Sequence, residues 1–259
     1  MLELKSIDKT FNIGTANENK LFSGFDLTIP KGQFLSIIGS NGSGKSTLLN
    51  IICGSLREDS GEILIDGENI KKIPEHKRYV KMGRVFQDPK MGTSPKMTIL
   101  ENMSMAENKN KSWNLTPGVN KKKREIYRDT LRGLGLGLED KLDDKVELLS
   151  GGQRQALALI MATLVPIDFL ILDEHTAALD PKTADTVMAI TDKLVREKNL
   201  TALMVTHNLN YSLKYGDRLI MMHKGEKIMD LAGEEKKNLK LDSILDKFYE
   251  ISIEVGNSL

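Results

Sequence analysis

The chain has 259 residues, which suits one large domain or two closely joined ones. Its 37 basic residues nearly balance 36 acidic ones, and the formal charge of +1 argues against a nucleic-acid partner, because phosphate binding needs a strong basic excess. No charge-free run reaches the ~18 apolar residues of a membrane span, and the N-terminus lacks the apolar block of a signal peptide, so we expect neither a span nor secretion.

The N-terminal region predicts three strands and a helix. Alternating apolar residues within 2–11 and 25–29 are typical of two antiparallel strands. The apolar run Phe34–Gly39 stops at a glycine and predicts a buried strand. A helix is expected over Lys45–Cys53. The single cysteine, Cys53, follows apolar residues, so we expect a buried free thiol.

Strands and helices alternate again toward the C-terminus. Strands are predicted at 62–65, 84–87, 169–172, 202–206 and 219–222, and helices at 181–198 and 208–215. This alternation favours a mainly parallel sheet. Residues 88–166 contain no convincing strand, but a helix with apolar residues at helical spacing begins near Ser150. We therefore expect an α-helical insertion there, with the basic run 121–124 as the solvated start of a helix.

Residues 39–47 match the pattern G-x-x-x-x-G-K-[ST] between a predicted strand and a predicted helix. The glycines let backbone N–H groups turn onto phosphate oxygens, and the helix N-terminus adds positive potential. Lys45 is predicted to reach the β- and γ-phosphates, and the Ser46 hydroxyl to ligate Mg²⁺. This P-loop comprises Gly39, Ser40, Asn41, Gly42, Ser43, Gly44, Lys45, Ser46 and Thr47. Alone it leaves kinases, GTPases and ATPases open.

A second anion-binding pattern lies about a hundred residues further on. The residues Leu149, Ser150, Gly151, Gly152 and Gln153 lie at the start of a predicted helix, and we name them the LSGGQ segment. A serine and two glycines at a helix N-terminus can hold an anion. Two such sites on one chain require either two nucleotides or one nucleotide shared between two chains, and the residues leave both arrangements open.

A third pattern is the apolar strand at 169–172, which is followed by Asp173 and Glu174. Such a strand would deliver two carboxylates at its carboxyl end, where ligands bind in open α/β sheets.

Together these motifs resemble the ATP-binding subunit of an ABC transporter, essentially from end to end. The resemblance implies an α/β P-loop NTPase fold with a mainly parallel sheet core, an N-terminal antiparallel β subdomain and an inserted α-helical subdomain. It implies a single domain over 1–259, with the core and β subdomain in about 1–87 and 167–259 and the helical subdomain in about 88–166. It also implies a head-to-tail homodimer, with ATP between the P-loop of one subunit and the LSGGQ segment of the other.

The resemblance also assigns roles to single residues. Asp173 would hold Mg²⁺ through water, and Glu174 would act as the general base on the attacking water. Gln87 matches a glutamine that contacts Mg²⁺ or water and senses the membrane subunit. Asp180 matches a loop at the dimer seam, and His207 a histidine that contacts the γ-phosphate.

The resemblance also bears on one aromatic residue and one histidine. The resemblance makes Phe11 the candidate to stack on adenine, although Phe22 and Phe25 are nearby aromatics. His175 stands where the family most often has proline after the catalytic glutamate, and we expect a packing variant rather than a catalytic histidine. The run 173–180 resembles a bacterial subgroup associated with amino-acid-like importers, with aromatic or branched-chain cargo.

The function implied is an ATPase that drives a separate membrane permease, most simply an importer with an extracytoplasmic solute-binding protein, from the inner face of the cell membrane. A soluble ABC ATPase of an assembly or repair system and an exporter ATPase use the same catalytic residues and stay open. A DNA-maintenance role is disfavoured by the charge and by the lack of long heptad arms. A non-enzymatic nucleotide-binding regulator would be expected to lack the catalytic acid, but Glu174 is present.

Overall fold

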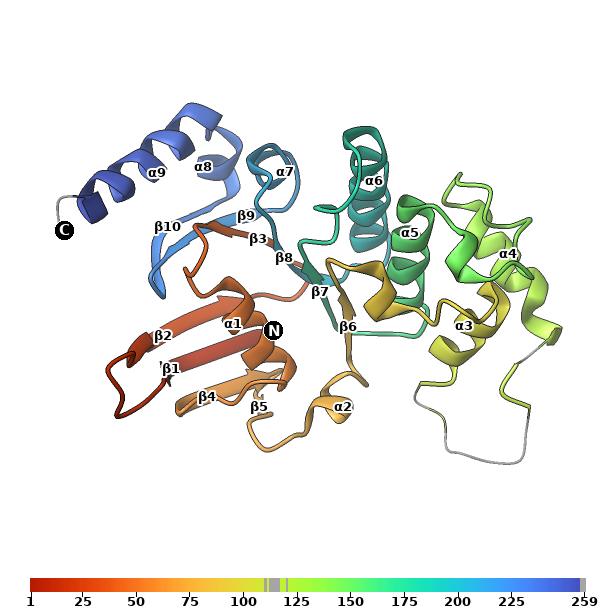
Figure 1. Cartoon of the computed structure of the whole chain (residues 1–259), viewed down its shortest axis with the longest axis horizontal. Helices are drawn as coiled ribbons and strands as arrows, with labels where there is room; N and C mark the ends of the chain where they lie inside the picture. The colour runs from red at the N-terminus through yellow and green to blue at the C-terminus, as the bar shows by residue number, and fades with distance from the viewer. Residues whose placement is uncertain (110, 112–116, 120, 257–259) are drawn as a thin grey trace.

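The computed structural model describes residues 1–109, 111, 117–119 and 121–256. An antiparallel sheet lies at one end of the molecule, a mainly parallel sheet crosses the middle, and a group of helices fills the other end (Figure 1). The antiparallel sheet has the order β2-β1-β4-β5. Its strands are β1 (Leu2–Phe11), β2 (Asn19–Ile29), β4 (Ser60–Ile65) and β5 (Glu68–Asn69).

The second sheet has six strands in the order β10-β9-β3-β8-β7-β6. They are β3 (Phe34–Gly39), β6 (Met82–Val85), β7 (Phe169–Asp173), β8 (Thr201–Val205), β9 (Arg218–His223) and β10 (Glu226–Ala232). All neighbouring pairs are parallel except β9 with β10. Every residue of β3 and β8 is buried, as expected for strands covered on both faces. The predicted α/β class with a mainly parallel sheet is confirmed.

Helix α1 (Lys45–Cys53) lies between the two sheets. Leu48, Leu49, Ile51 and Ile52 are fully buried against apolar side chains of both sheets, and Cys53 is a buried free thiol, as predicted. The opposite face of the parallel sheet is covered mainly by α6 (Pro181–Glu197), with α7 (Leu209–Lys214) beside it. The P-loop therefore connects a buried strand, β3, with a helix, α1, that packs against both sheets.

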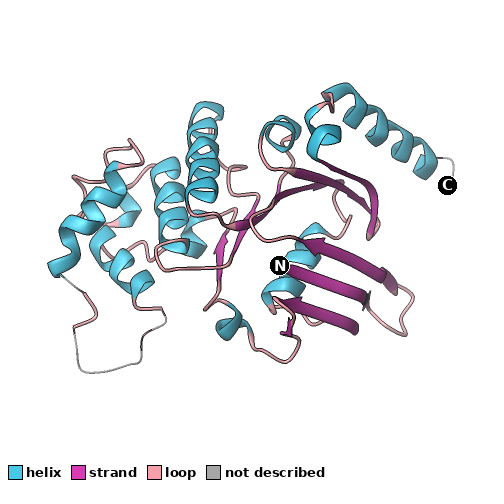
Figure 2. Cartoon of the chain, turned by 180° about the vertical axis from the view of Figure 1, so that it is seen from behind, coloured by secondary structure: helices cyan, strands magenta, loops and turns pink. Residues whose placement is uncertain are grey.

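The helices of the middle region gather at one end of the molecule (Figure 2). They are α3 (Ile99–Glu107), α4 (Arg124–Arg132) and α5 (Gly151–Ala162), and they share a core of their own. Within the described part of 88–166 no strand forms, as expected. The basic run begins a short 3-10 turn, Lys121–Lys123, that leads into α4, in agreement with the predicted helix start.

Several elements depart from the sequence-based bounds. Strand β2 begins at Asn19, six residues before the expected start, because its polar end pairs with β1 (Phe11 opposite Asn19). Strand β6 ends at Val85, so Gln87 follows the strand rather than ending it. Strand β10 and the helices α2 (Glu75–Arg78), α8 (Gly233–Lys237) and α9 (Leu241–Gly256) were not predicted. None of the described helices is long and apolar enough to cross a bilayer.

Candidate active site

The P-loop turns from β3 into α1 through backbone conformations that favour glycine. Gly44 has φ 104° and caps α1, and Gly42 has φ 78°. At Gly39 an added Cβ would lie 2.2 Å from the Met222 carbonyl oxygen, so the end of β3 packs directly against β9. The glycines are therefore required by the turn itself, and the turn leaves the N-terminus of α1 facing the cavity.

Lys45 lies inside this turn. Its Nζ donates to the carbonyl oxygens of Gly39 (2.9 Å) and Ser40 (2.8 Å), and the residue is only 5% exposed. Burial lowers the pKa of Lys45, and the nearby Glu174 carboxylate opposes that shift. The ammonium group is thus held inside the loop, beside the cavity that the loop lines.

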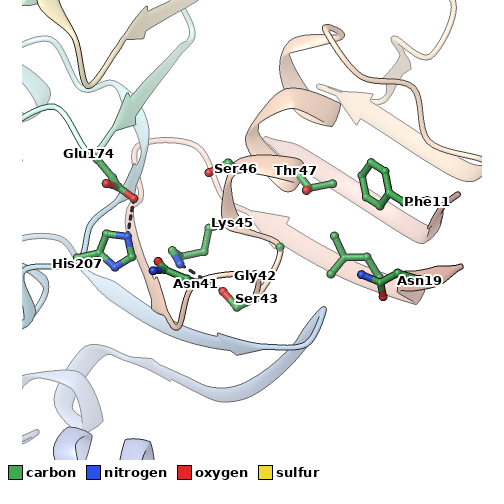
Figure 3. A pocket seen from close by; sticks show the side chains of 12 residues that line it. Phe11, Asn19, Asn41, Gly42, Ser43, Lys45, Ser46, Thr47, Glu174 and His207 are labelled. Carbon is green, nitrogen blue, oxygen red and sulfur yellow. Dashed lines mark hydrogen bonds and ion pairs between the residues drawn. The ribbon is translucent and has the colours of Figure 1, made fainter. Parts of the chain in front are cut away.

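A cavity of about 280 Å³ opens in front of the P-loop. It is lined by Phe11, Asn19, Leu21, residues 41–47, Glu174 and His207. Figure 3 shows Phe11 and Asn19 at one end, the P-loop in the middle and Glu174 with His207 at the other. The structure therefore brings together, from β1, α1 and the ends of β7 and β8, most of the residues predicted to bind the nucleotide.

Phe11 is the aromatic side chain available at this cavity. It is partly buried and carries Lys9 Nζ 5.5 Å from its ring centroid. Phe22 and Phe25 are instead core residues, exposed by 0% and 6%, with their ring centroids 5.0 Å apart. Of the three aromatics considered from the sequence, Phe11 is the one whose position allows stacking on a base.

Glu174 and His207 form a close pair. His207 Nε2 lies 2.7 Å from Glu174 Oε1. Glu174 has φ 47°, and its N–H donates to the Val205 carbonyl at 2.9 Å, which ties the residue after β7 to the end of β8. Non-glycine residues at positive φ are uncommon, and strained backbone is frequent at functional sites. The Glu174 carboxylate faces His207 and the cavity.

His175 points away from the cavity and is 2% exposed. Its Nε2 lies 3.1 Å from Thr191 Oγ1 on α6, and that hydroxyl in turn donates to the Val187 carbonyl, so His175 Nε2–H is the donor. Burial lowers the pKa of His175 to about 4, which keeps the ring neutral. These contacts agree with the expected packing role and explain how a histidine fits after Glu174.

Asp173 and Gln87 line a second, more open cavity beside the first. Thr47 and Phe11 border both cavities. The second also contains Arg84 of β6, whose Nη2 donates to Asp173 Oδ2 at 2.7 Å. Sequence reasoning missed Arg84. Its signal is a charged residue in a short strand, Met-Gly-Arg-Val, that is otherwise apolar and mostly buried.

The LSGGQ segment and Asp180 line neither of these cavities. Ser150 caps α5 by accepting from the Gln153 N–H at 3.2 Å, and Asp180 caps α6 by accepting from the Thr183 N–H at 3.1 Å. A Cβ added at Gly151 would lie 3.3 Å from Leu179, so the two segments are neighbours. A single chain thus separates its LSGGQ segment from its own P-loop cavity.

The donor set fits a magnesium nucleotide. The Ser46 hydroxyl and the Asp173 carboxylate offer the hard oxygen ligands that Mg²⁺ prefers. In the part of the chain that the structure describes, no group of three or more His, Cys, Asp or Glu residues could hold a metal alone.

Comparisons with known proteins agree on one family. The family model described as ABC transporter matches residues 22–177. A tyrosine transport ATP-binding protein of Clostridioides difficile is 52% identical over 96% of this chain and 98% of that protein. The ABC transporter ATP-binding protein YxdL of Bacillus subtilis is 34% identical over 95% of this chain and 92% of that protein.

Solved structures agree. A dimeric post-hydrolysis state of the ATP-binding cassette MJ0796 bound to ADP and Pi is 32% identical, with a TM-score of 0.74, and covers 90% of this chain and 98% of that chain. The ADP conformation of the cassette MJ1267 is 28% identical, with a TM-score of 0.77, over 96% and 98%.

Proposed function

This chain belongs to the ABC transporter family as an ATP-binding subunit whose hydrolysis of ATP powers transport, and on that premise we propose that it drives import of an aromatic amino acid, tyrosine first, through a separate permease. One observation carries the cargo class. The 52% identity to a tyrosine transport ATP-binding protein extends over almost the full length of both chains. Because an ATPase subunit does not itself bind the cargo, the identity supports a shared permease type.

We further propose the assembly in which the chain works. Residues 1–259 form one domain, with the ATP-binding core and β subdomain in 1–87 and 167–259 and the helical subdomain in 88–166. Two copies enclose ATP and Mg²⁺ head to tail and dock on permease subunits at the inner face of the cell membrane, with an extracytoplasmic solute-binding protein delivering cargo. Support comes from the LSGGQ segment, which does not line the P-loop cavity of its own chain, and from the dimeric cassette of similar fold.

The proposed hydrolytic roles follow the cavity geometry. The P-loop N–H groups and Lys45 bind the phosphates, and Ser46 with Asp173 would hold Mg²⁺, which neutralises charge that develops on the phosphates. Glu174 orients and deprotonates the attacking water, and His207, 2.7 Å away, fixes the Glu174 carboxylate and reaches the γ-phosphate. From the partner copy, Ser150 completes the phosphate site with the α5 N-terminus.

A reconstituted complex tests the proposed cargo. The chain, its permease and its solute-binding protein in proteoliposomes should hydrolyse ATP faster when tyrosine is supplied, and should accumulate labelled tyrosine. A matched set of aliphatic and cationic amino acids serves as the comparison. Stimulation by a cationic amino acid in place of tyrosine would reject the aromatic cargo and leave the ATPase assignment intact.

Gln87 is exposed next to the Asp173 cavity, where it could report on the permease. We predict that Gln87→Ala lowers tyrosine transport in the same proteoliposomes by about tenfold or more, with ATP affinity changed less than about threefold, because phosphate contacts lie in the P-loop. Lys90→Ala, an exposed neighbour, is the control and should transport normally. Equal losses of transport and ATP affinity would count against a coupling role.

Phe11 provides a separate prediction about the adenine. Phe11→Ala should weaken ATP and ADP binding alike, by about 1–3 kcal/mol or roughly 5- to 150-fold, since stacking on a base does not involve the γ-phosphate. Calorimetric titration of both nucleotides measures this. Phe11→Trp keeps an aromatic face and should bind as the parent does. If Phe11→Ala bound ATP and ADP with the parental affinity, Phe11 would not be the residue that stacks on adenine.

A further inference from the structure

An ion pair joins two neighbouring strands at the edge of the second cavity. Arg84 of β6 is paired in register with Ile171 of β7, so its side chain lies on the same face as Asp173, two residues further along β7. Arg84 Nη2 lies 2.7 Å from Asp173 Oδ2, and the two side chains are only 9% and 18% exposed. The carboxylate that is proposed to hold Mg²⁺ therefore already has a cation against one oxygen.

The surroundings of Arg84 hold it at this carboxylate. Its guanidinium carbon lies 4.8 Å from the centroid of the Phe86 ring, and its buried Nε has no hydrogen-bond partner among the described residues. The adjacent Cys53 thiol offers no negative charge, because burial raises its pKa. Asp173 is thus the carboxylate that neutralises Arg84 in the described part of the chain.

We propose that Arg84 acts as the resident counter-cation of Asp173 and keeps divalent metal from binding there until ATP supplies the negative charge of its phosphates. Two cations at one carboxylate repel each other strongly at this range, even where solvent reduces the effect. ATP adds negative charge on the opposite side of the metal and offsets that repulsion. The metal then enters with the nucleotide rather than before it. This inference rests on the proposed ATP and Mg²⁺ site.

Binding of Mn²⁺, followed by electron paramagnetic resonance, tests the proposal without measuring turnover. All proteins carry Glu174→Gln so that ATP persists. Arg84→Met keeps most of the side-chain length and removes the charge, so it should bind Mn²⁺ at least about tenfold more tightly than the Arg84 protein, most clearly without nucleotide. Arg84→Lys keeps the charge and should stay within about threefold of the parent. Arg218→Met, which breaks the remote Arg218–Asp230 pair, should change nothing.

Weaker Mn²⁺ binding in Arg84→Met would overturn the proposal and show that Arg84 orients Asp173 for the metal instead. Unchanged binding would overturn it too. If Arg84→Met fails to fold, nuclear magnetic resonance of the guanidinium groups in the Arg84 protein decides the matter: adding Mg²⁺ to the ATP-bound protein should free the restricted rotation of Arg84, and an unchanged signal contradicts the proposal. ATP binding without metal is measured in parallel. A protein that does not bind ATP would contradict the proposed function rather than the role of Arg84.

Discussion

Lys45→Ala should abolish measurable ATP hydrolysis while the protein stays folded. Lys45 is the cation at the centre of the P-loop, and removing one preorganised donor to a developing charge costs about 10²–10³-fold in rate. ATP affinity should fall as well, because Lys45 is also proposed to contact the phosphates of bound ATP. The rate is measured as phosphate release by the purified chain, at ATP concentrations far above the dissociation constant of the parent protein.

The control for this variant must separate chemistry from folding. The Lys45 ammonium also cross-links the loop through two carbonyl oxygens, so some loss of thermal stability is expected. Lys224→Ala changes an exposed lysine in the turn after β9 and should hydrolyse ATP at the parental rate. If a folded Lys45→Ala protein hydrolysed ATP at the parental rate, the proposed role of the P-loop in hydrolysis would be wrong.

Glu174→Gln should lower hydrolysis by about 10²–10⁴-fold, the usual contribution of a general base. Glutamine keeps the size of the side chain and can still accept from His207 Nε2, but it cannot take a proton from water. ATP binding should therefore survive. Single-turnover hydrolysis and equilibrium binding of ATP measure the two effects separately.

Glu197→Gln, at the exposed end of α6, provides a matched control with the same chemical change and should leave both quantities unaffected. If Glu174→Gln hydrolysed ATP at the parental rate, the base would have to be sought elsewhere in the cavity. Loss of ATP binding in a folded Glu174→Gln protein would instead mean that the carboxylate supports the nucleotide itself.

Much of the core follows from local sequence pattern. The run Phe34–Gly39, the glycine-rich turn and Lys45–Cys53 form the strand, loop and helix that the pattern predicts, because apolar runs and special backbone conformations are encoded locally. The same holds for Ser150, where the capping residues define the start of α5. These positions carry the proposed phosphate site.

What the pattern could not supply depends on register and on neighbours distant in sequence. The Arg84–Asp173 pair exists because β6 is aligned with β7 in one register, which no local signal specifies. The polar start of β2 is a strand only because β1 lies beside it. Likewise, the P-loop and the LSGGQ segment on one chain allowed either two nucleotides per chain or one nucleotide shared between two chains. The separation of the LSGGQ segment from the P-loop cavity supports the shared nucleotide.

The mass of Glu174→Gln protein in solution tests the shared site most directly. Light scattering during gel filtration in saturating ATP and Mg²⁺ should give a dimer, and in ADP a monomer, because in the proposed assembly the γ-phosphate would connect Lys45 and His207 of one copy to Ser150 of the other. Adding Ser150→Arg should return the protein to a monomer that still binds ATP at its own P-loop. A Glu174→Gln protein that stays monomeric in saturating ATP, or a dimer that Ser150→Arg leaves intact, would contradict the account.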